Sequence, residues 1–360
     1  MFSRLFHLVK HTPLRELPER LNRSFRHRIL HQPDAMLLQV VSACNLRCKH
    51  CFLTDYGTVI PDGQIKVIPF DEVQVRLEKL RPLIKQVRAL MFSSFEALLH
   101  KDIFRMMDAA LAINPKLSFP ILTNGQLVTP EIVARLENYR LSCVTISLDG
   151  LKPETVEAFK TGAKFEKTIN AIQLFCKSKH QNLVNVVFVA HRKNIRELPD
   201  YMDFVASLGV KDVQVSNLLT FREDLQSECL YGSEDTAWVE GIFAEAQKRA
   251  QINGQILGLP GLKPKPLGCT QSETVMIDID GNITPCDFLA VHTPFYFQGK
   301  RREVRPLRFG NVFKANNPLA IWYSKDAKEF RAMHRQGEIP APCSHCIDAY
   351  GLMCSRRDVK

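Results

Sequence analysis

The stretch "SACNLRCKHC" (residues 42–51) places Cys44, Cys48 and Cys51 within eight positions. No fourth cysteine follows closely, whereas a structural zinc ion takes four ligands and usually draws them from matched cysteine pairs. The C-x3-C-x2-C spacing instead suits three thiolates around one iron–sulfur cubane, which leaves one iron without a protein ligand. Because an open metal position is typical of a catalytic site, the stretch predicts a reactive cluster.

Strand-like and helix-like patterns alternate around the cysteines. The apolar runs lie at residues 36–42, 87–93, 117–123, 141–148, 183–190 and 210–216. Helical patterns separate them, with Thr129 and Pro130 at one helix start and Gly209 at one helix end. Six strands with right-handed helical crossovers predict an α/β fold, a partial (β/α)6 TIM-like barrel of parallel strands. The cysteines follow the first run, at the carboxyl ends of the strands where such barrels bind ligands.

Three further motifs stand at strand ends. They are "LMFSSFEALLHKDI" (90–103), "TNG" (123–125) and "SLDG" (147–150). Together with the cysteine spacing they resemble the radical S-adenosylmethionine (SAM) superfamily over residues 36–216. The alternative is a coincidental group of core or zinc-binding cysteines, and the agreement of spacing with strand position argues against it.

The resemblance implies a set of cofactor contacts in this chain. These are His50, Ser94, Phe95, Glu96, Thr123, Asn124, Ser147, Asp149 and Arg192. His50 precedes the third cysteine, a position near the adenine in the family. The family's Gly-Gly-Glu-Pro, which meets the amino group of SAM, keeps only Glu96 here, since Ser94, Phe95 and Ala97 replace the glycines and the proline. Glycine lets a ligand approach the backbone, so Phe95 either alters the binding geometry or is a core residue.

The polar residues at the other strand ends have a second interpretation. Asn-Gly and Asp-Gly form turns in their own right, so Thr123, Asn124, Ser147 and Asp149 serve either SAM contact or turn formation. Arg192 follows the fifth run and would meet the carboxylate of SAM or an anion of the substrate.

The resemblance also implies a reaction. In the family, SAM chelates the open iron, and one electron from the reduced cluster cleaves it to methionine and a 5′-deoxyadenosyl radical. That radical takes hydrogen from the substrate. The electron would come from a flavodoxin- or ferredoxin-like donor. The difficult chemistry belongs to the cofactors, and the protein positions them and excludes water.

A second cysteine group lies in the last hundred residues. Cys269 and Cys286 frame "DIDGN" (278–282), a hairpin signal, and Cys343 and Cys346 form a C-x2-C pair. The pattern resembles the SPASM and twitch modules of radical SAM enzymes, which implies one auxiliary 4Fe–4S cluster on these four cysteines. The alternative is a zinc site on the same cysteines. Cys354 is spare, with packing, alternative ligation or hydrogen donation to a substrate radical as its possible roles.

The patterns divide the chain into four parts. We expect a basic leader at 1–34, the barrel at 35–230, a linker helix at 231–258 and the auxiliary-cluster module at 259–360. Cys143, Cys176 and Cys229 stand alone and are expected to be small buried hydrophobes.

Composition and charge argue against several classes of protein. The 360 residues carry a net charge of +10, with seven Lys/Arg against two Glu in the first 32 residues and a second basic cluster, "GKRREVRPLR" (299–308). Solvated surface explains both clusters better than nucleic-acid binding, because aromatic side chains do not interleave with the arginines. No apolar run reaches the ~20 residues of a membrane span, and the leader is too basic for a secretory signal. We therefore expect a cytoplasmic protein with reduced cysteines.

These observations predict a radical SAM oxidoreductase or maturase. Its substrate would be a peptide undergoing maturation. A dehydrogenase of a small polar molecule is one alternative. The other is a degenerate member that keeps its clusters but serves only electron transfer or binding.

Overall fold

The structure is a computed structural model that describes residues 31–51, 66–232, 235–269 and 273–353. Cys354 and nearly all of the expected leader lie outside these ranges. In the described part of the chain, none of the helices has the length and apolar character that crossing a membrane requires.

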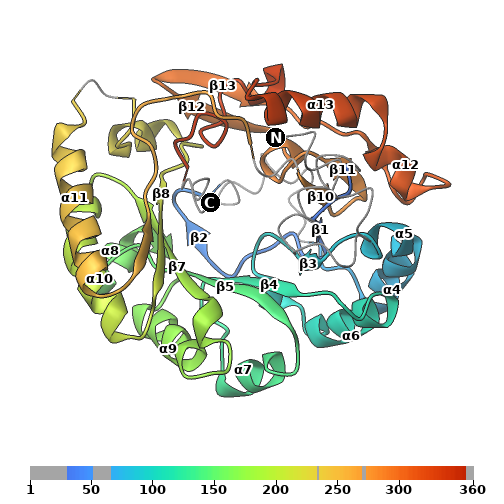
Figure 1. Ribbon diagram of the computed structural model, residues 1–360, viewed down its shortest axis with the longest axis horizontal. Coiled ribbons are helices and arrows are strands. Elements are labelled where there is room, and N and C mark those ends of the chain that lie inside the picture. The colour runs from blue at the N-terminus through green and yellow to red at the C-terminus, as the bar shows by residue number, and fades with distance from the viewer. Residues whose placement is uncertain (1–30, 52–65, 233–234, 270–272, 354–360) are drawn as a thin grey trace, which may run out of the picture.

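Six parallel strands form the barrel and confirm the predicted fold class. They are β1 (Ala35–Leu38), β3 (Ala89–Phe92), β4 (Phe119–Thr123), β5 (Leu141–Ser147), β7 (Val184–Ala190) and β8 (Asp212–Asn217). β1 pairs with β3, and β4, β5, β7 and β8 pair in that order. A parallel bridge between Ala89 and Ser118 joins the two sheets. The strands therefore make an incomplete ring with helices outside it (Figure 1).

The crossover helices cover the outer face of the ring. They are α4 (Phe70–Lys79), α5 (Arg81–Ile84), α6 (Ile103–Ile113), α7 (Pro130–Leu136), α8 (Pro153–Phe159), α9 (Phe165–Cys176), α10 (Leu198–Ser207) and α11 (Ala237–Ile252). Short 3-10 turns lie at η4 (Ala97–Leu99), η5 (Gln181–Leu183), η6 (Ile195–Glu197), η7 (Glu223–Glu228), η9 (Phe288–Ala290) and η10 (Ala341–Cys343). The predicted boundary signals are confirmed: Thr129 accepts the Ile132 N–H at 3.3 Å as the cap of α7, and Gly209 follows α10 with φ of 92°.

Strands from outside the barrel lengthen both of its edges. They are β9 (Ile256–Gly258), β10 (Thr274–Ile277), β11 (Asn282–Thr284) and β14 (Gly310–Asn311). β9 pairs in parallel with β8, so the expected linker at 231–258 is a helix only from 237 to 252 and ends in a strand of the barrel sheet. β10 pairs in parallel with β1 and begins the "DIDGN" hairpin with β11. The boundaries of the four parts remain a prediction.

The rest of the C-terminal region lies across the ring from β4 and β5 (Figure 1). It comprises β12 (Thr293–Phe297), β13 (Lys300–Val304), α12 (Pro318–Trp322) and α13 (Lys325–Gln336). Its apolar side chains, among them Phe295 and Ile347, form a second hydrophobic cluster. This cluster also includes Phe221 and Tyr231 from the segment after β8, and it contacts Cys286 and Cys346.

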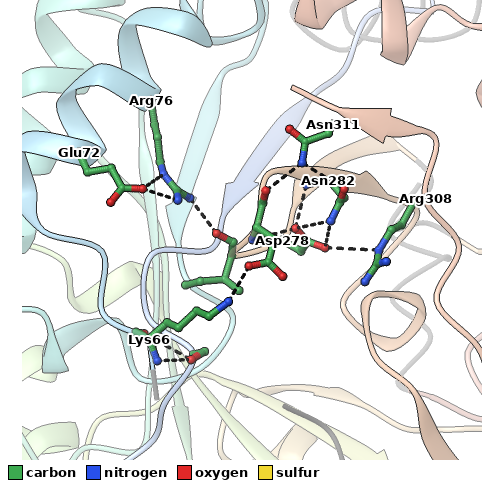
Figure 2. Close-up of polar contacts among 10 residues, drawn as sticks. Lys66, Glu72, Arg76, Asp278, Asn282, Arg308 and Asn311 are labelled. Atoms are coloured by element: carbon green, nitrogen blue, oxygen red, sulfur yellow. Dashed lines mark hydrogen bonds and ion pairs between the residues drawn. The ribbon is translucent and has the colours of Figure 1, made fainter. Parts of the chain in front are cut away.

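Polar contacts hold the hairpin turn against α4 (Figure 2). Lys66 pairs with Asp280 at 2.8 Å, and Arg76 of α4 donates to Ile279 O at 2.9 Å. The Asp278 carboxylate accepts the N–H groups of Asp280 and Asn282, which closes the turn. The turn predicted from sequence is therefore also a contact between the C-terminal region and the barrel.

Candidate active site

The three N-terminal cysteines lie on one loop after β1, which includes the short strand β2 (Arg47–Cys48). The Cys51 N–H donates to Cys48 O at 3.0 Å and turns the loop back on itself. The Cys44 sulfur accepts from the Leu46 N–H at 3.4 Å and from Asn124 Nδ2 at 3.5 Å. N–H groups aimed at sulfur favour the thiolate, the form in which cysteine binds metals.

The loop fits a cluster in donor chemistry and in placement. Besides burial, the charges of Cys51 and Cys44 raise the pKa of Cys48, as expected for cysteines that share one short loop. Burial raises the pKa of Cys48 to about 12, and bound iron would have to displace the thiol protons. Among the described residues, no three His, Cys, Asp or Glu side chains gather as closely as a single metal ion requires. Each thiolate of a cubane binds a different iron, so those sulfurs stand farther apart than the ligands of one ion.

Glu96 joins two of the predicted motifs. Its side chain is buried, and its carboxylate accepts from Thr123 Oγ1 at 3.1 Å and from the Asn124 N–H at 2.9 Å. Burial raises the pKa of Glu96 to about 7, although these hydrogen bonds lower it. Asn124 also reaches the cysteine loop, so the ends of β1, β3 and β4 meet at one point.

The segment that replaces the family glycines rests on a buried glutamine. Gln39 Oε1 accepts the Ser94 N–H at 3.1 Å, and Ser93 Oγ accepts the Phe95 N–H at 3.2 Å. Ser93 has φ of 73°, in the left-handed region that favours glycine. Ser94 and Phe95 are both half-buried, so the Phe95 ring is not a fully buried core residue.

A buried ion pair lies beside the cysteine loop. β6 (Lys160–Thr161) pairs with β2, which sets Lys160 opposite Cys48. Lys160 Nζ donates to Ser147 Oγ at 2.6 Å and lies 3.1 Å from the Asp149 carboxylate. Asp149 also accepts the Val189 N–H at 3.0 Å. Ser147 and Asp149, the two residues predicted from "SLDG" as SAM contacts, therefore both interact with the Lys160 ammonium group.

Three rings stack next to this pair. The Phe159 ring lies 3.9 Å from His191 and 5.9 Å from His50, with nearly parallel planes in both cases. His191 is buried, and neither of its ring nitrogens has a hydrogen-bond partner among the described residues. The nearest carboxylate is Glu228, at 3.9 Å from Nδ1. Burial lowers the pKa of His191 to about 4, which keeps the ring neutral.

The four C-terminal cysteines also come together. After burial and the nearby Asp348, the charges of Cys346 and Cys286 raise the pKa of Cys269, and after burial Cys346 raises that of Cys343. The Leu289 N–H donates to the Cys286 sulfur at 3.4 Å. Burial raises the pKa of all four thiols. The hairpin and the C-x2-C pair therefore place thiols that influence one another, and their shared role as cluster ligands stays a prediction.

Two polar side chains accompany these cysteines. The Cys269 thiol lies 2.9 Å from the Asp348 carboxylate, and the Cys343 sulfur lies 3.6 Å from His334 Nε2. His334 lies in the last turn of α13 and is buried, and no sequence motif marks either side chain.

Comparison with known proteins agrees with this geometry. Residues 38–205 match the model of the radical SAM superfamily, and residues 269–347 match that of an iron–sulfur cluster-binding domain, SPASM. The chain belongs to the radical SAM superfamily. Its cofactors are SAM and 4Fe–4S clusters, one that binds SAM and one auxiliary, and it is an enzyme of this class.

Several relatives align with this radical SAM protein along most of its length. The tungsten-containing aldehyde ferredoxin oxidoreductase cofactor-modifying protein of Pyrococcus furiosus is 25% identical over 86% of each chain. The AdoMet-dependent heme synthase of Methanosarcina barkeri is 27% identical over 90% of each chain. The PqqA peptide cyclase of Bradyrhizobium diazoefficiens is 24% identical over 89% of this chain and 82% of its own. Among solved structures, anSMEcpe with bound AdoMet and Cp18Cys peptide superposes with a TM-score of 0.63 at 19% identity, covering 89% of each chain, which shows the shared fold.

Among the described residues, no hydrogen bond or ring contact joins Arg192 to the other predicted SAM contacts of this radical SAM enzyme. It is exposed, and its guanidinium lies 5.5 Å from the Trp238 ring. It lines a cavity of about 220 Å³ together with Cys229, Tyr231, Tyr296 and the turn between β12 and β13. Cys229, expected to be a buried hydrophobe, is half-buried and borders this space.

Sequence reasoning missed Lys160 and Asp348, which lie beside the two cysteine groups, and Glu228, which lies beside His191. Lys160 ends a helix pattern in "AFKTG" and is brought to Cys48 only by strand pairing. Asp348 and Glu228 carry no motif. A charged residue at a helix end is expected to be exposed. Its burial depends on tertiary packing, which local sequence patterns do not indicate.

Proposed function

We propose that Cys44, Cys48 and Cys51 bind the SAM-cleaving cluster of a peptide-modifying enzyme. The observation that carries this proposal is that the three cysteines share one loop at the carboxyl end of β1, where the Cys44 sulfur lies within hydrogen-bond reach of Asn124 at the end of β4. Cys269, Cys286, Cys343 and Cys346 would hold the auxiliary cluster. That cluster would accept the surplus electron or bind the substrate.

When bound together, the cluster and SAM supply a 5′-deoxyadenosyl radical by one-electron cleavage of the sulfonium. The protein's own part is to hold and shield them. Asn124 ties the cysteine loop to β4, and the Glu96 carboxylate offers a buried negative charge for the ammonium group of SAM. Phe159 and the neighbouring histidine rings would exclude water from the region beside the cysteine loop.

A peptide is the proposed substrate. The PqqA peptide cyclase relative supports it, because this chain matches that enzyme along most of its length. The heme synthase relative makes a non-peptide substrate the competing outcome. A flavodoxin- or ferredoxin-like protein as electron donor and a cytoplasmic location complete the proposal.

The first experiment tests the radical chemistry. Anaerobically reconstituted protein receives SAM and dithionite, and 5′-deoxyadenosine is measured by chromatography. We expect formation in the wild type and none in Cys48→Ser. A degenerate member would give no 5′-deoxyadenosine even though its clusters are intact by iron and sulfide analysis.

The second experiment tests the substrate class. Candidate precursor peptides, chosen from short reading frames beside the gene, are prepared in perdeuterated form and incubated with the enzyme, SAM and reductant. Deuterium in 5′-deoxyadenosine, together with a mass change in the peptide, is the expected result. Efficient SAM cleavage with no deuterium transfer would overturn the peptide assignment and leave the radical chemistry standing.

A further inference from the structure

The β12–β13 hairpin has one open edge. Among the described strands, β12 and β13 pair only with each other. The far side of β12 is already in use, because the Tyr296 N–H donates to Thr220 O at 2.8 Å and Thr220 Oγ1 donates to Tyr296 O. On β13, residues 300–303 are exposed. β13 is therefore the free side of this sheet in the described part of the chain.

The register shows which backbone groups face outward from β13. Tyr296 directs its N–H and C=O away from β13, toward Thr220. Opposite residues in an antiparallel pair share the same hydrogen-bonding state, and Tyr296 is paired with Arg301. The N–H and C=O of Arg301 therefore point to the open side, as do those of Glu303 two residues on. No hydrogen bond within the described residues occupies them.

The open edge is strongly basic. Lys300, Arg301, Arg302 and Arg305 are all exposed, and Glu303 is the one carboxylate among them. Glu303 is already engaged, by Arg301 at 2.5 Å and by His292 at 3.3 Å. Cations on an edge strand discourage self-association, and they also attract a partner of opposite charge.

The hairpin leads to the barrel mouth. Its turn, Gln298 and Gly299, lines the cavity of about 220 Å³ that Arg192 and Cys229 border from the loops after β7 and β8. Those loops stand at the carboxyl ends of the strands, on the same side as the cysteine loop. A chain lying along β13 is thereby adjacent to the space in front of the catalytic end.

We propose that β13 captures an acidic, extended segment of the substrate peptide as an added strand, with the rest of the peptide directed into the cavity at the hairpin turn. This inference rests on the proposed peptide substrate. Main-chain hydrogen bonds from Arg301 and Glu303 would supply the affinity that any extended chain obtains at a sheet edge. Lys300, Arg302 and Arg305, which pair with no carboxylate of the described residues, would select acidic side chains and make binding weaken with salt.

Binding is tested with the full-length, cluster-loaded enzyme. The probe is a fluorescein-labelled peptide that alternates Glu and Val, and its Gln/Val counterpart is the neutral control. Fluorescence anisotropy should show tighter binding of the acidic peptide, with an advantage that shrinks at high salt. Equal affinity for the two peptides, or tighter binding of a single-stranded RNA oligomer, would overturn the proposal.

The strand-addition part is tested with a matched pair of variants. Arg301→Ala removes the side chain but keeps the outward N–H, whereas Arg301→Pro removes both, at an edge position where proline breaks no bond to β12. Arg301→Pro should bind the acidic peptide about fivefold more weakly than Arg301→Ala, the effect of one net hydrogen bond. Equal affinities of the two variants would contradict an added strand.

Two further measurements separate loss of peptide docking from misfolding of a variant and from failure of the proposed radical chemistry. Amide hydrogen exchange on the wild type needs no variant, and Arg301 and Glu303 should gain protection when the acidic peptide binds. 5′-Deoxyadenosine formed without peptide reports the radical chemistry separately and should be unchanged in both variants. If that formation is normal while exchange at β13 is unaffected by peptide, only the docking inference is wrong.

Discussion

Lys160 and Asp149 form an ion pair at 3.1 Å in which both side chains are almost fully buried, at 4% and 1% exposure. Lys160 stands opposite Cys48 on the paired strands β6 and β2, and Asp149 follows β5. The pair therefore connects the cysteine loop to the carboxyl end of β5. Its charges are shielded from water, so the loss of either one is costly.

Lys160→Met should destabilise the protein by roughly 3–5 kcal/mol, because it leaves the Asp149 carboxylate buried without its cation. Urea unfolding under anaerobic conditions measures the change. The double variant Lys160→Met/Asp149→Asn should recover most of the loss, since the side-chain amide oxygen of the asparagine would still accept the Val189 N–H. Arg81→Met is the matched control, because its partner Glu78 is exposed and such pairs contribute about 0–1 kcal/mol. A loss no larger than in this control would contradict the buried pair.

Glu96 and His191 should give stability trends of opposite sign with pH. Burial raises the pKa of Glu96 from 4.5 to about 7, so its stabilising contribution is full below pH 4.5 and is lost as pH rises through 7. Burial lowers the pKa of His191 from 6.5 to about 4, so its contribution is full above pH 6.5 and is lost as pH falls toward 4. Each of these pKa shifts changes the free energy of unfolding by about 3 kcal/mol.

Between pH 4.5 and 6.5 the two trends oppose each other, and the wild type without SAM should show a shallow dependence. In Glu96→Gln the free energy of unfolding should rise with pH across this window, and in His191→Gln it should fall. Urea unfolding at several pH values measures both slopes. Parallel curves for the wild type and Glu96→Gln would show that Glu96 titrates normally.

The sequence predicted the strands and the cysteine groups for a physical reason. Short apolar runs separated by capped helices specify a parallel sheet locally, and thiol spacing is a local property of a loop. Cysteines within each group influence one another electrostatically, and their binding of iron stays a prediction. Likewise, "DIDGN" forms its hairpin because Gly281 has φ of 89°, which other residues rarely adopt.

Long-range pairing lay beyond local patterns. β10 joins the barrel beside β1, which is more than two hundred residues earlier, and the contact is held by Arg76 and Lys66, which no motif marks. The end of the expected linker forms β9, which pairs with the edge of β8, and no local pattern indicates this pairing. Ser147 and Asp149 were expected to meet SAM or form a turn, and their bonds to Lys160 depend on a strand pair two residues long.

Gly268→Ala should remove the auxiliary cluster without touching a cysteine. Gly268 has φ of 75°, and a Cβ there would lie 2.3 Å from His334 O, so the backbone that carries Cys269 must shift. The iron content should fall from about eight to about four per chain. Gly254→Ala is the control: its φ is also positive, at 64°, but nothing lies within 4 Å of the added Cβ. That control should cost only the conformational strain of about 1–2 kcal/mol and keep all of its iron.

The two cysteine groups should prove separable by function. Cys343→Ser should retain about four irons and still form 5′-deoxyadenosine in the absence of substrate, because the loop at residues 44–51 is intact. Cys48→Ser should also retain about four irons, now in the C-terminal group, but should form none. Iron, sulfide and zinc analysis with a single-turnover assay measures both variants. If the wild type instead carries about four irons and one zinc, and Cys343→Ser loses only the zinc, then the C-terminal cysteines form a structural zinc site that stabilises the region around Phe295 and Ile347 and transfers no electrons.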